Sequence, residues 1–348
     1  MRLNGAFARD LDEVVVHGRP ALEALRGARI FITGGTGFFG RWLIAALAHA
    51  HDAYGIEALV LSRNPQGFAA AHPDLAGHPA IALHRGDARN FDFPQGRFTH
   101  VIHAAADTSA AADADKAELV DSIVGGTQRV LQFAASAKAE RLLYVSSGAV
   151  YGPQPSDVAH LAEGFSGAPD PLDPRSAYGE SKRLAELLCV CAAARGGPQA
   201  VVARAFAFVG PGLPLDGHFA IGNFIRDAVA GQGIVVAGDG TPLRSYLYAG
   251  DLVAWLLTLL ARGEAGAAYN VGSDAAVGIA ELAQRVAAVG GSKAAVVVKG
   301  VANPKAPRAR YVPCVARARA LGLDVWTPLD EAIRRTMDAA ASPMVAES

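Results

Sequence analysis

The chain has little cysteine and no long hydrophobic run, and each shortage argues against a class of protein. Its 348 residues include three cysteines, Cys189, Cys191 and Cys314, which form no CxxC pair. We therefore expect neither a disulfide scaffold nor a structural zinc site. No apolar run approaches the ~18 residues that cross a bilayer, and the N-terminus lacks the apolar stretch of a secretory signal. These absences predict a protein of the reducing cytoplasm that does not span a membrane.

An excess of charge of one sign is also absent. Lys and Arg number 32 against 33 Asp and Glu, which gives a formal net charge of −1. Without a basic field the chain is not expected to hold a nucleic acid or an anionic membrane surface. Hydrophobic residues make up 51% and charged residues 19%, which is typical of a globular chain. A small molecule is therefore the expected partner.

Short apolar runs alternate with longer helical patterns from Ala28 onward. This alternation is typical of βαβ units, in which a parallel strand is covered by helices on both faces. The predicted fold is an α/β, Rossmann-type doubly wound parallel sheet. Its strands are expected at 28–33, 57–62, 80–84, 99–105, 141–147 and 200–206, and its helices at 38–50, 112–137 and 178–194.

The second half of the chain is richer in turn residues. Beyond Phe206, glycine-rich turns separate helical patterns at 219–230, 251–261, 279–289 and 329–340. We predict a smaller, partly interleaved C-terminal substrate lobe. The expected organisation is an N-terminal extension at 1–27, a dinucleotide-binding domain at 28–205, a mainly substrate-binding lobe with segments returning to the first domain at 206–341, and a tail at 342–348.

A glycine-rich turn follows the first predicted strand and opens the first helix. Gly34, Gly37 and Gly40 stand at three-residue spacing in ITGGTGFFGRW. The first glycine allows a tight turn, the second lets the backbone approach a pyrophosphate, and the third lets helix and strand pack closely. The helix N-terminus adds free N–H groups for the anion. We therefore predict a dinucleotide site here, which includes Phe38 and Phe39.

The end of the second strand predicts which dinucleotide binds. An acid at this place would bind the ribose 2′-hydroxyl of NAD, but the sequence reads Ser62-Arg63. A guanidinium pairs instead with a 2′-phosphate, so NADP is preferred and NAD is the alternative. Asp87, after the third strand, is placed to accept the adenine amino group. The alternatives are that Arg63 is a solvated loop residue and Asp87 a turn residue.

Three further residues form a candidate catalytic set. Tyr178 and Lys182 stand four apart in YGESK, so on a helix they share one face. A nearby ammonium favours the phenolate, which makes the tyrosine a usable proton acceptor or donor. Ser147, at the end of the fifth strand, can donate to the same substrate oxygen. This set suits alcohol/ketone interconversion, although Tyr178 could instead be a packing residue with Lys182 paired to Glu186.

From Thr33 to Thr336 the chain resembles the extended short-chain dehydrogenase/reductase family of NAD(P)-dependent nucleotide-sugar epimerases, dehydratases and reductases. The matching motifs are Thr33-Gly34-x-x-Gly37-x-x-Gly40, the HAAA run from His103 to Ala106, Ser147 with Val150-Tyr151-Gly152, Tyr178 with Lys182, Arg204, Gly210-Pro211, the GDG at Gly238 to Gly240, Arg244, Asp251, and YNVG at Tyr269 to Gly272.

The resemblance implies roles for individual residues. Ser147, Tyr178 and Lys182 take the catalytic roles, and Tyr178 and Lys182 also contact the cofactor. Ala104, Ala105 and Ala106 run beside the cofactor. The substrate is a nucleotide-diphosphate sugar, whose diphosphate Arg244 clamps while His218 and Asn223 shape the pocket. It also implies a homodimer formed by the helices at 112–137 and 178–194, where the apolar LAELLCVCAAA segment lies. The alternative is burial of that segment against the chain's own C-terminal lobe.

Departures from the family pattern narrow the reaction. Family 4,6-dehydratases carry an acid after the catalytic serine or threonine, whereas this chain has Gly148 and Ala149. This absence argues against elimination. Because the missing acid near Ser62 favours a releasable NADP, we favour reduction of a nucleotide-linked ketosugar, with C4 as the expected carbon. A 4-epimerase with retained NAD is the alternative, and a dehydratase or a non-catalytic nucleotide-sensing module is less favoured.

Overall fold

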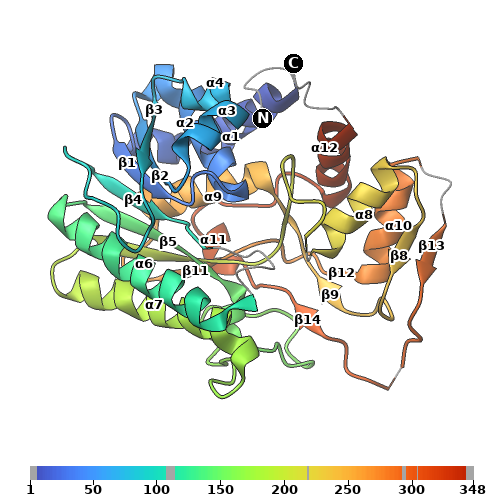
Figure 1. Ribbon diagram of the computed structural model, residues 1–348. Helices are drawn as coiled ribbons and strands as arrows, with labels where there is room; N and C mark the ends of the chain where they lie inside the picture. The colour runs from blue at the N-terminus through green and yellow to red at the C-terminus, as the bar shows by residue number, and fades with distance from the viewer. Residues whose placement is uncertain (1–5, 107–113, 218, 292–294, 304, 342–348) are drawn as a thin grey trace.

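A seven-stranded parallel sheet forms the centre of the molecule (Figure 1). The computed structural model describes residues 6–106, 114–217, 219–291, 295–303 and 305–341. The sheet order is β11-β6-β5-β4-β1-β2-β3, with every pair parallel. The strands are β1 (Arg29–Thr33), β2 (Glu57–Ser62), β3 (Ile81–Arg85), β4 (His100–His103), β5 (Arg141–Ser147), β6 (Gln199–Ala205) and β11 (Ala268–Val271). The Rossmann-type prediction is confirmed, and the seventh strand comes from the C-terminal half.

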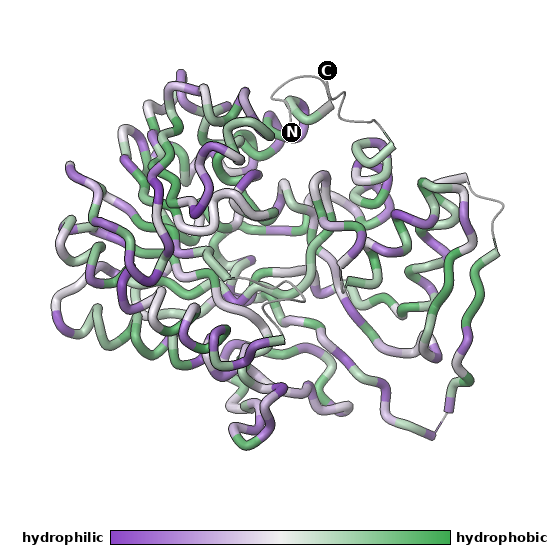
Figure 2. Tube along the Cα trace, in the orientation of Figure 1, coloured by the Kyte–Doolittle hydropathy of each residue, from purple (hydrophilic) through white to green (hydrophobic). Residues whose placement is uncertain are grey.

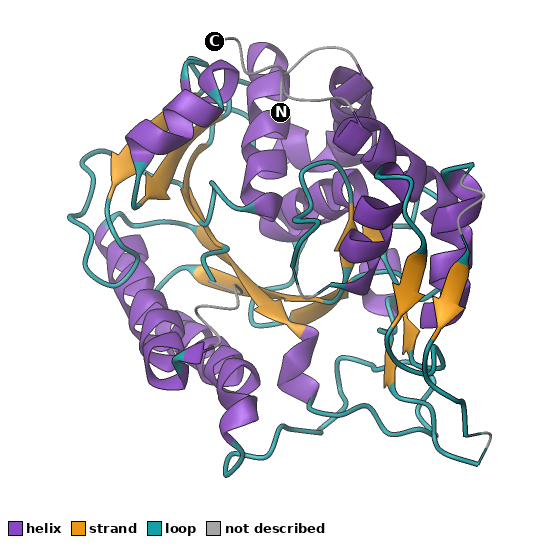
Figure 3. Ribbon diagram, turned by 45° about the vertical axis from the view of Figure 1, so that its right-hand side comes forward, coloured by secondary structure: helices purple, strands orange, loops and turns teal. Residues whose placement is uncertain are grey.

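Helices cover both faces of this sheet (Figure 3). Side chains alternate along each strand: Ile30 and Ile32 join one hydrophobic cluster and Phe31 joins the other. The first cluster packs under α1 (Ala6–Ala24), α2 (Phe38–Tyr54) and α9 (Ala249–Arg262), and the second under α6 (Lys116–Ser136) and α7 (Ala177–Ala194). Burial on both faces explains why the strands read as continuous apolar runs.

The N-terminal extension, whose role the sequence left unassigned, contains the helix α1. This helix packs on α9 and α2, and the Phe7 ring lies 4.8 Å from that of Trp42. Its Asp10 carboxylate accepts from the Tyr248 hydroxyl (2.8 Å) and from Arg335 (2.6 Å). Arg335 also donates to Glu13 at 2.6 Å. We call Asp10, Glu13, Tyr248 and Arg335 the N-terminal helix cluster, because it joins the first and last described helices.

The remaining elements form the smaller lobe and the connections. Helices α8, α10 and α12 pack together beside β8 and β13, and β9 pairs with both β12 and β14. Along the outer helices the hydropathy alternates between hydrophilic and hydrophobic (Figure 2). The bounds are α3 (Pro65–Ala71), α4 (Pro73–Ala76), η1 (Gly148–Tyr151), η2 (Pro174–Ser176), β7 (Phe208–Val209), α8 (Ala220–Val229), β8 (Ile234–Val236), β9 (Leu243–Arg244), β10 (Leu247–Tyr248), β12 (Val277–Gly278), α10 (Ile279–Val289), β13 (Val296–Val298), β14 (Arg310–Tyr311), α11 (Ala316–Arg319) and α12 (Leu329–Ala341).

Within the described ranges, no helix has both the length and the hydrophobicity that crossing a membrane requires.

Candidate functional site

The glycine-rich turn lies between β1 and α2 and touches the loop that follows β4. Gly34 has a φ of 73°, and a side-chain carbon there would lie 2.5 Å from the backbone carbonyl of Ala104. Gly40 has no room for a side chain either, because the backbone of Gly34 and Gly35 fills the space. Gly37 is the exposed N-cap of α2, and within the described chain no side chain caps this helix start. The turn therefore presents bare backbone at a helix N-terminus, as an anion site requires.

The adjoining HAAA segment is fixed by a hydrogen-bond chain through His103. Thr127 donates its hydroxyl proton to the Ile123 carbonyl (2.7 Å), so it accepts from Nε2–H of His103 at 3.0 Å. Nδ1 of His103 then accepts from the Thr33 hydroxyl at 2.6 Å, which itself accepts from the Ala105 amide. Burial lowers the pKa of His103 to about 3, so the ring is neutral. Ala104, Ala105 and Ala106 are thereby held half-buried beside the glycine turn.

Ser147, Tyr178 and Lys182 meet at the carboxyl end of β5. Ser147 ends this strand, and its hydroxyl forms a hydrogen bond with that of Tyr178 near the start of α7. Lys182 lies one turn further, where its ammonium donates to the Val145 carbonyl at 2.9 Å and lies 6.0 Å from the centre of the Tyr178 ring. In parallel α/β sheets, ligands bind at the carboxyl ends of the strands.

Burial changes the acid–base properties of two of these groups. It raises the pKa of the Tyr178 phenol, and the hydrogen bond with Ser147 lowers it by less. The sequence predicts that Lys182 favours the phenolate, but in this structure burial dominates, so Tyr178 keeps its proton at neutral pH. Burial also lowers the pKa of Lys182 to about 8. The pair therefore presents a proton donor beside an ammonium that titrates near neutrality.

A second tyrosine reaches the same hydroxyl from the C-terminal lobe. Tyr311, on β14, forms a hydrogen bond with Ser147, and its ring lies 4.6 Å from that of Phe206. A side-chain carbon on Gly148 would lie 2.6 Å from the Tyr311 hydroxyl. Gly148, which stands where family 4,6-dehydratases carry an acid, thus leaves room for the Tyr311 phenol. Sequence reasoning missed Tyr311, because its only signal is the distant pairing of β14 with β9.

A buried ionic network lies directly behind these residues. The Glu186 carboxylate accepts from the Ser146 hydroxyl (2.6 Å) and from Arg204 (2.7 Å). Arg204 also donates to the Tyr151 hydroxyl, which in turn donates to Asn270 at 2.7 Å. We call these five residues the site-side network. The alternative pairing of Lys182 with Glu186 is therefore replaced by Glu186 with Arg204 and Lys182 with the Val145 carbonyl.

Comparison with known proteins identifies the family. The chain matches the NAD dependent epimerase/dehydratase family over residues 30–272, more than half of its length. It belongs to this family. It is 30% identical over 304 residues to UDP-glucuronic acid decarboxylase 6 of Arabidopsis thaliana, covering 86% of this chain and 84% of that protein.

Two solved structures that hold a nicotinamide cofactor have the same fold. RMD from Pseudomonas aeruginosa, complexed with NADPH, aligns with a TM-score of 0.71 and 27% identity over 90% of this chain and 99% of its own. MoeE5 in complex with UDP-glucose and NAD aligns with a TM-score of 0.73 and 26% identity over 90% of this chain and 98% of its own. The chain is thus an enzyme of the extended short-chain dehydrogenase/reductase type.

The residues predicted for the adenosine side of this family site lie together after β2 and β3. Ser62 is buried and accepts from the Asn64 amide at 3.2 Å, and Arg63 is exposed. Asp87 accepts from Nε of Arg89 at 3.0 Å, and this bond, with the charge of Arg63 as a smaller cause, lowers the Asp87 pKa. Asp87 also accepts backbone bonds from two following residues, so it is a turn residue as well.

Phe38 and Phe39 open α2, and the Phe39 ring packs edge-on against Phe208 at 4.8 Å. Both side chains are half-buried against the core, so their packing fixes the start of α2.

The predicted substrate residues belong to the smaller lobe. Arg244 on β9 is half-buried and lies opposite Tyr311 in the β9–β14 pair, which brings it toward the reacting groups. Asn223 on α8 donates to the Gly217 carbonyl at 3.2 Å and accepts from Arg226. His218 lies outside the described residues. Arg310, which sequence reasoning missed, adjoins Tyr311 and has a buried Nε without a hydrogen-bond partner in the described structure.

Among the described residues there is no cluster of three or more His, Cys, Asp or Glu side chains that could hold a metal ion.

Proposed function

We propose that this protein reduces a nucleotide-linked ketosugar, with C4 as the reacting carbon, using a nicotinamide cofactor. The observation that carries the proposal is that three features lie together at the carboxyl end of the parallel sheet. These are the bare glycine turn against Ala104, the Ser147–Tyr178 hydrogen bond, and the Lys182 ammonium 6.0 Å from the Tyr178 ring. Relatives that act on nucleotide sugars support the substrate class.

The residues present fit a dinucleotide. The turn from Gly34 to Gly40 packs too closely on neighbouring backbone to carry side chains at Gly34 and Gly40, so it presents bare backbone, and α2 offers its N-terminus to the negative charge of a pyrophosphate. Ala104 to Ala106 have no long side chains to obstruct a nicotinamide ribose beside them. The cofactor, when bound, supplies the hydride.

In the proposed reaction Tyr178 donates its proton to the carbonyl oxygen of the sugar. Burial keeps this phenol protonated, which suits the reductive direction. Ser147 donates a hydrogen bond to the same oxygen, and Lys182 offsets the negative charge that develops on the phenolate. Solvent then returns the proton to Tyr178.

The direction and the cofactor form are linked. Arg63, with no carboxylate at the end of β2, favours NADP, which exchanges freely and suits a reductase. The second candidate is an enzyme that keeps NAD, oxidises the sugar and later reduces it again, as an epimerase does. The similarity to a UDP-glucuronic acid decarboxylase favours this candidate as a class.

For the substrate, a nucleotide diphosphate matches the arginines of the smaller lobe. Arg244 and Arg310 lie on paired strands, and the buried Nε of Arg310 lacks a partner in the described structure. Guanidinium groups bind phosphate in a forked contact that lysine does not reproduce. The proposed clamp therefore joins the diphosphate to the strand that carries Tyr311.

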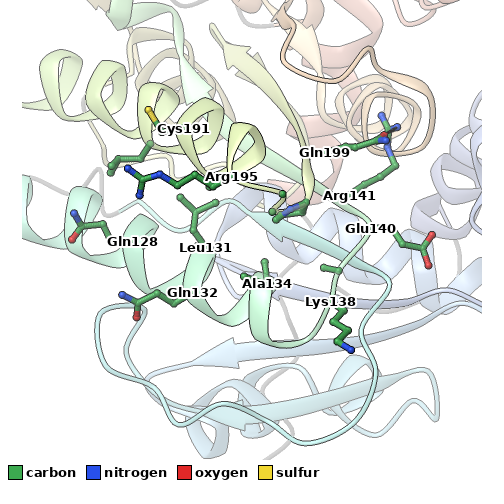
Figure 4. Close-up of a pocket in the computed structure, with 17 residues that line it drawn as sticks. Gln128, Leu131, Gln132, Ala134, Lys138, Glu140, Arg141, Cys191, Arg195 and Gln199 are labelled. Carbon is green, nitrogen blue, oxygen red and sulfur yellow. Dashed lines mark hydrogen bonds between the residues drawn. The ribbon is translucent and has the colours of Figure 1, made fainter.

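The α6–α7 face fits a second copy of the chain. Leu184, Leu187 and Val190 of α7 are 44%, 57% and 44% exposed, and Val120 of α6 is 39% exposed. A groove continues this face between the ends of both helices, and its lining includes Leu131 of α6 and Cys191 of α7 (Figure 4). It lies at the amino ends of β5 and β6, away from Ser147. We propose a homodimer here; light scattering that shows a monomer at micromolar concentration would contradict it.

The function is tested by combining a binding and a turnover assay. Purified protein is examined by mass spectrometry for retained cofactor, then incubated with UDP- and dTDP-linked 4-ketosugars and NADPH or NADH. We expect cofactor-free protein and stoichiometric NADPH oxidation with a reduced sugar nucleotide. Tightly bound NAD with interconversion or decarboxylation and no added cofactor would support the second candidate. A protein that binds cofactor but is inert on the panel would favour the sensing module.

A further inference from the structure

The site-side network ends one helical turn from the ammonium of the candidate site. Glu186 stands four residues after Lys182 in α7, so both side chains leave the same face of the helix. The Glu186 carboxylate is fixed from two further elements. Ser146 on β5 donates to it at 2.6 Å, and Arg204 on β6 donates to both of its oxygens. Its side chain is only 12% exposed.

The other groups around Lys182 are neutral near pH 8. From β4, His103 has its pKa lowered to about 3 by burial. From β5, the Tyr144 ring lies 4.9 Å from the ammonium, and burial holds the pKa of its phenol well above the usual value. On α7 itself, burial raises the pKa of Tyr178, and it raises that of Cys189 to about 12.

Glu186 is therefore the group in this set that supplies negative charge. Burial lowers the pKa of Lys182, and the nearby Glu186 carboxylate raises it. Arg204 offsets part of that carboxylate charge. Its guanidinium, however, also lies 4.8 Å from the Tyr151 ring and donates to the Glu163 carbonyl, contacts that Lys182 does not share.

We propose that Glu186 is a positioning residue for the reaction: held by Ser146 and Arg204, its carboxylate keeps Lys182 protonated beside Tyr178. The inference rests on the proposed function, in which the charge of Lys182 is needed. It also gives a role to motif residues that take no part in the proposed function. Arg204 holds the carboxylate, and Tyr151, which itself donates to Asn270, accepts from Arg204.

The test is the pH dependence of kcat/KM in wild type and Glu186→Gln. The amide has nearly the same shape but carries no charge, and its single carbonyl oxygen keeps only part of the hydrogen bonds from Ser146 and Arg204. Because the protonated lysine is the active form, its loss sets the alkaline limb, which lies near pH 8 in wild type. We expect Glu186→Gln to move this limb downward by on the order of one pH unit, with activity below it within about threefold of wild type.

Two variants separate charge from packing. Glu186→Asp keeps the charge and loosens the contacts, so its limb stays near that of wild type. Glu180→Gln removes a carboxylate from the same helix. Glu180 lies 3.6 Å from Arg183, a loose pairing. We expect the pH profile of this variant to match that of wild type. If the Glu186→Gln limb does not move while activity drops equally at every pH, Glu186 acts by packing alone and the inference is wrong.

A folding defect is handled by a second variant and a second readout. Glu186→Gln/Arg204→Gln removes both charges, so no buried ion is left unpaired, and it should move the limb in the same direction. The pH dependence of NADPH binding, followed by its fluorescence, reports on Lys182 without turnover. Wild type that neither binds a nicotinamide cofactor nor turns over overturns the proposed function and this inference together. A working wild type with an unmoved limb in both variants overturns only the inference.

Discussion

Two buried ionic clusters in this molecule use the same chemistry at different places. In the site-side network, the side chains of Arg204 and Glu186 are 16% and 12% exposed, and their ion pair joins β6 to α7. In the N-terminal helix cluster, Arg335 and Asp10 are 18% and 6% exposed and join the two ends of the chain. The two clusters are similarly buried, so they differ in what lies beside them. The site-side network lies beside Lys182, and the N-terminal helix cluster lies between packed helices. We expect changes around the first to affect catalysis and changes around the second to affect stability.

The largest effect is expected at the reacting groups. Tyr178→Phe removes the proton donor, so kcat/KM should fall by about 10²–10⁴-fold, with thermal stability and NADPH affinity near those of wild type. Stopped-flow assays measure kcat/KM, thermal denaturation measures the stability, and fluorescence titration measures the NADPH affinity. Tyr269→Phe, on β11, removes a buried hydroxyl that accepts from the Glu264 amide and is the control for loss of a phenol. Equal activity of Tyr178→Phe and wild type would place the chemistry elsewhere.

Next comes the salt bridge at the chain ends. Arg335→Met leaves the buried Asp10 carboxylate without its cation, which should lower the free energy of unfolding by about 3 kcal/mol. Urea denaturation measures this loss, while kcat/KM of the folded protein stays within about twofold. Arg334→Met is a matched control, because this neighbour is 50% exposed and its loss should cost about 0.5 kcal/mol. A fall in kcat/KM with unchanged stability would remove the distinction between the clusters.

A smaller effect is expected from pH at Asp251, beside the same cluster. Burial raises its pKa to about 6, although it accepts from the amide and hydroxyl of Thr327. The folded carboxyl therefore binds its proton more tightly than the unfolded one, so stability falls as pH rises from about 4 to about 6. Urea denaturation at both pH values should show a loss about 2 kcal/mol larger in wild type than in Asp251→Asn. Identical losses in both would show that Asp251 does not titrate in this window, and Asp330→Asn, at an exposed site, should match wild type.

The smallest effect is expected at the rim of the cofactor site. Arg63→Ser removes the guanidinium after β2, so the preference for NADPH over NADH should fall about tenfold, with little change in NADH affinity. Isothermal titration with both cofactors gives the ratio. A ratio that stays constant would show that another group recognises the 2′-phosphate.

The first six strands were predicted to within two residues, because β1, β2, β5 and β6 are buried on both faces and read as largely apolar runs, whereas the edge strand β3 is partly exposed. The proximity of Ser147, Tyr178 and Lys182 could be predicted because one strand end and one helix turn place them, and their catalytic roles stay a prediction. Tyr311 could not be found in this way, because it reaches Ser147 through the pairing of β14 with β9, which leaves no local pattern. The helix α1 was also missed, since Pro20 interrupts its pattern and its partners Tyr248 and Arg335 lie far along the chain.

The seventh strand has a consequence for how the chain folds as it is made. β6 is complete at Ala205, but its edge stays open until β11, which begins at Ala268, has been synthesised. Until then the nascent polypeptide presents an unpaired apolar strand, the kind of edge that recruits other chains. A ribosome that pauses between these two strands would prolong this exposure, so the interval from 206 to 267 is where slow translation should most increase aggregation.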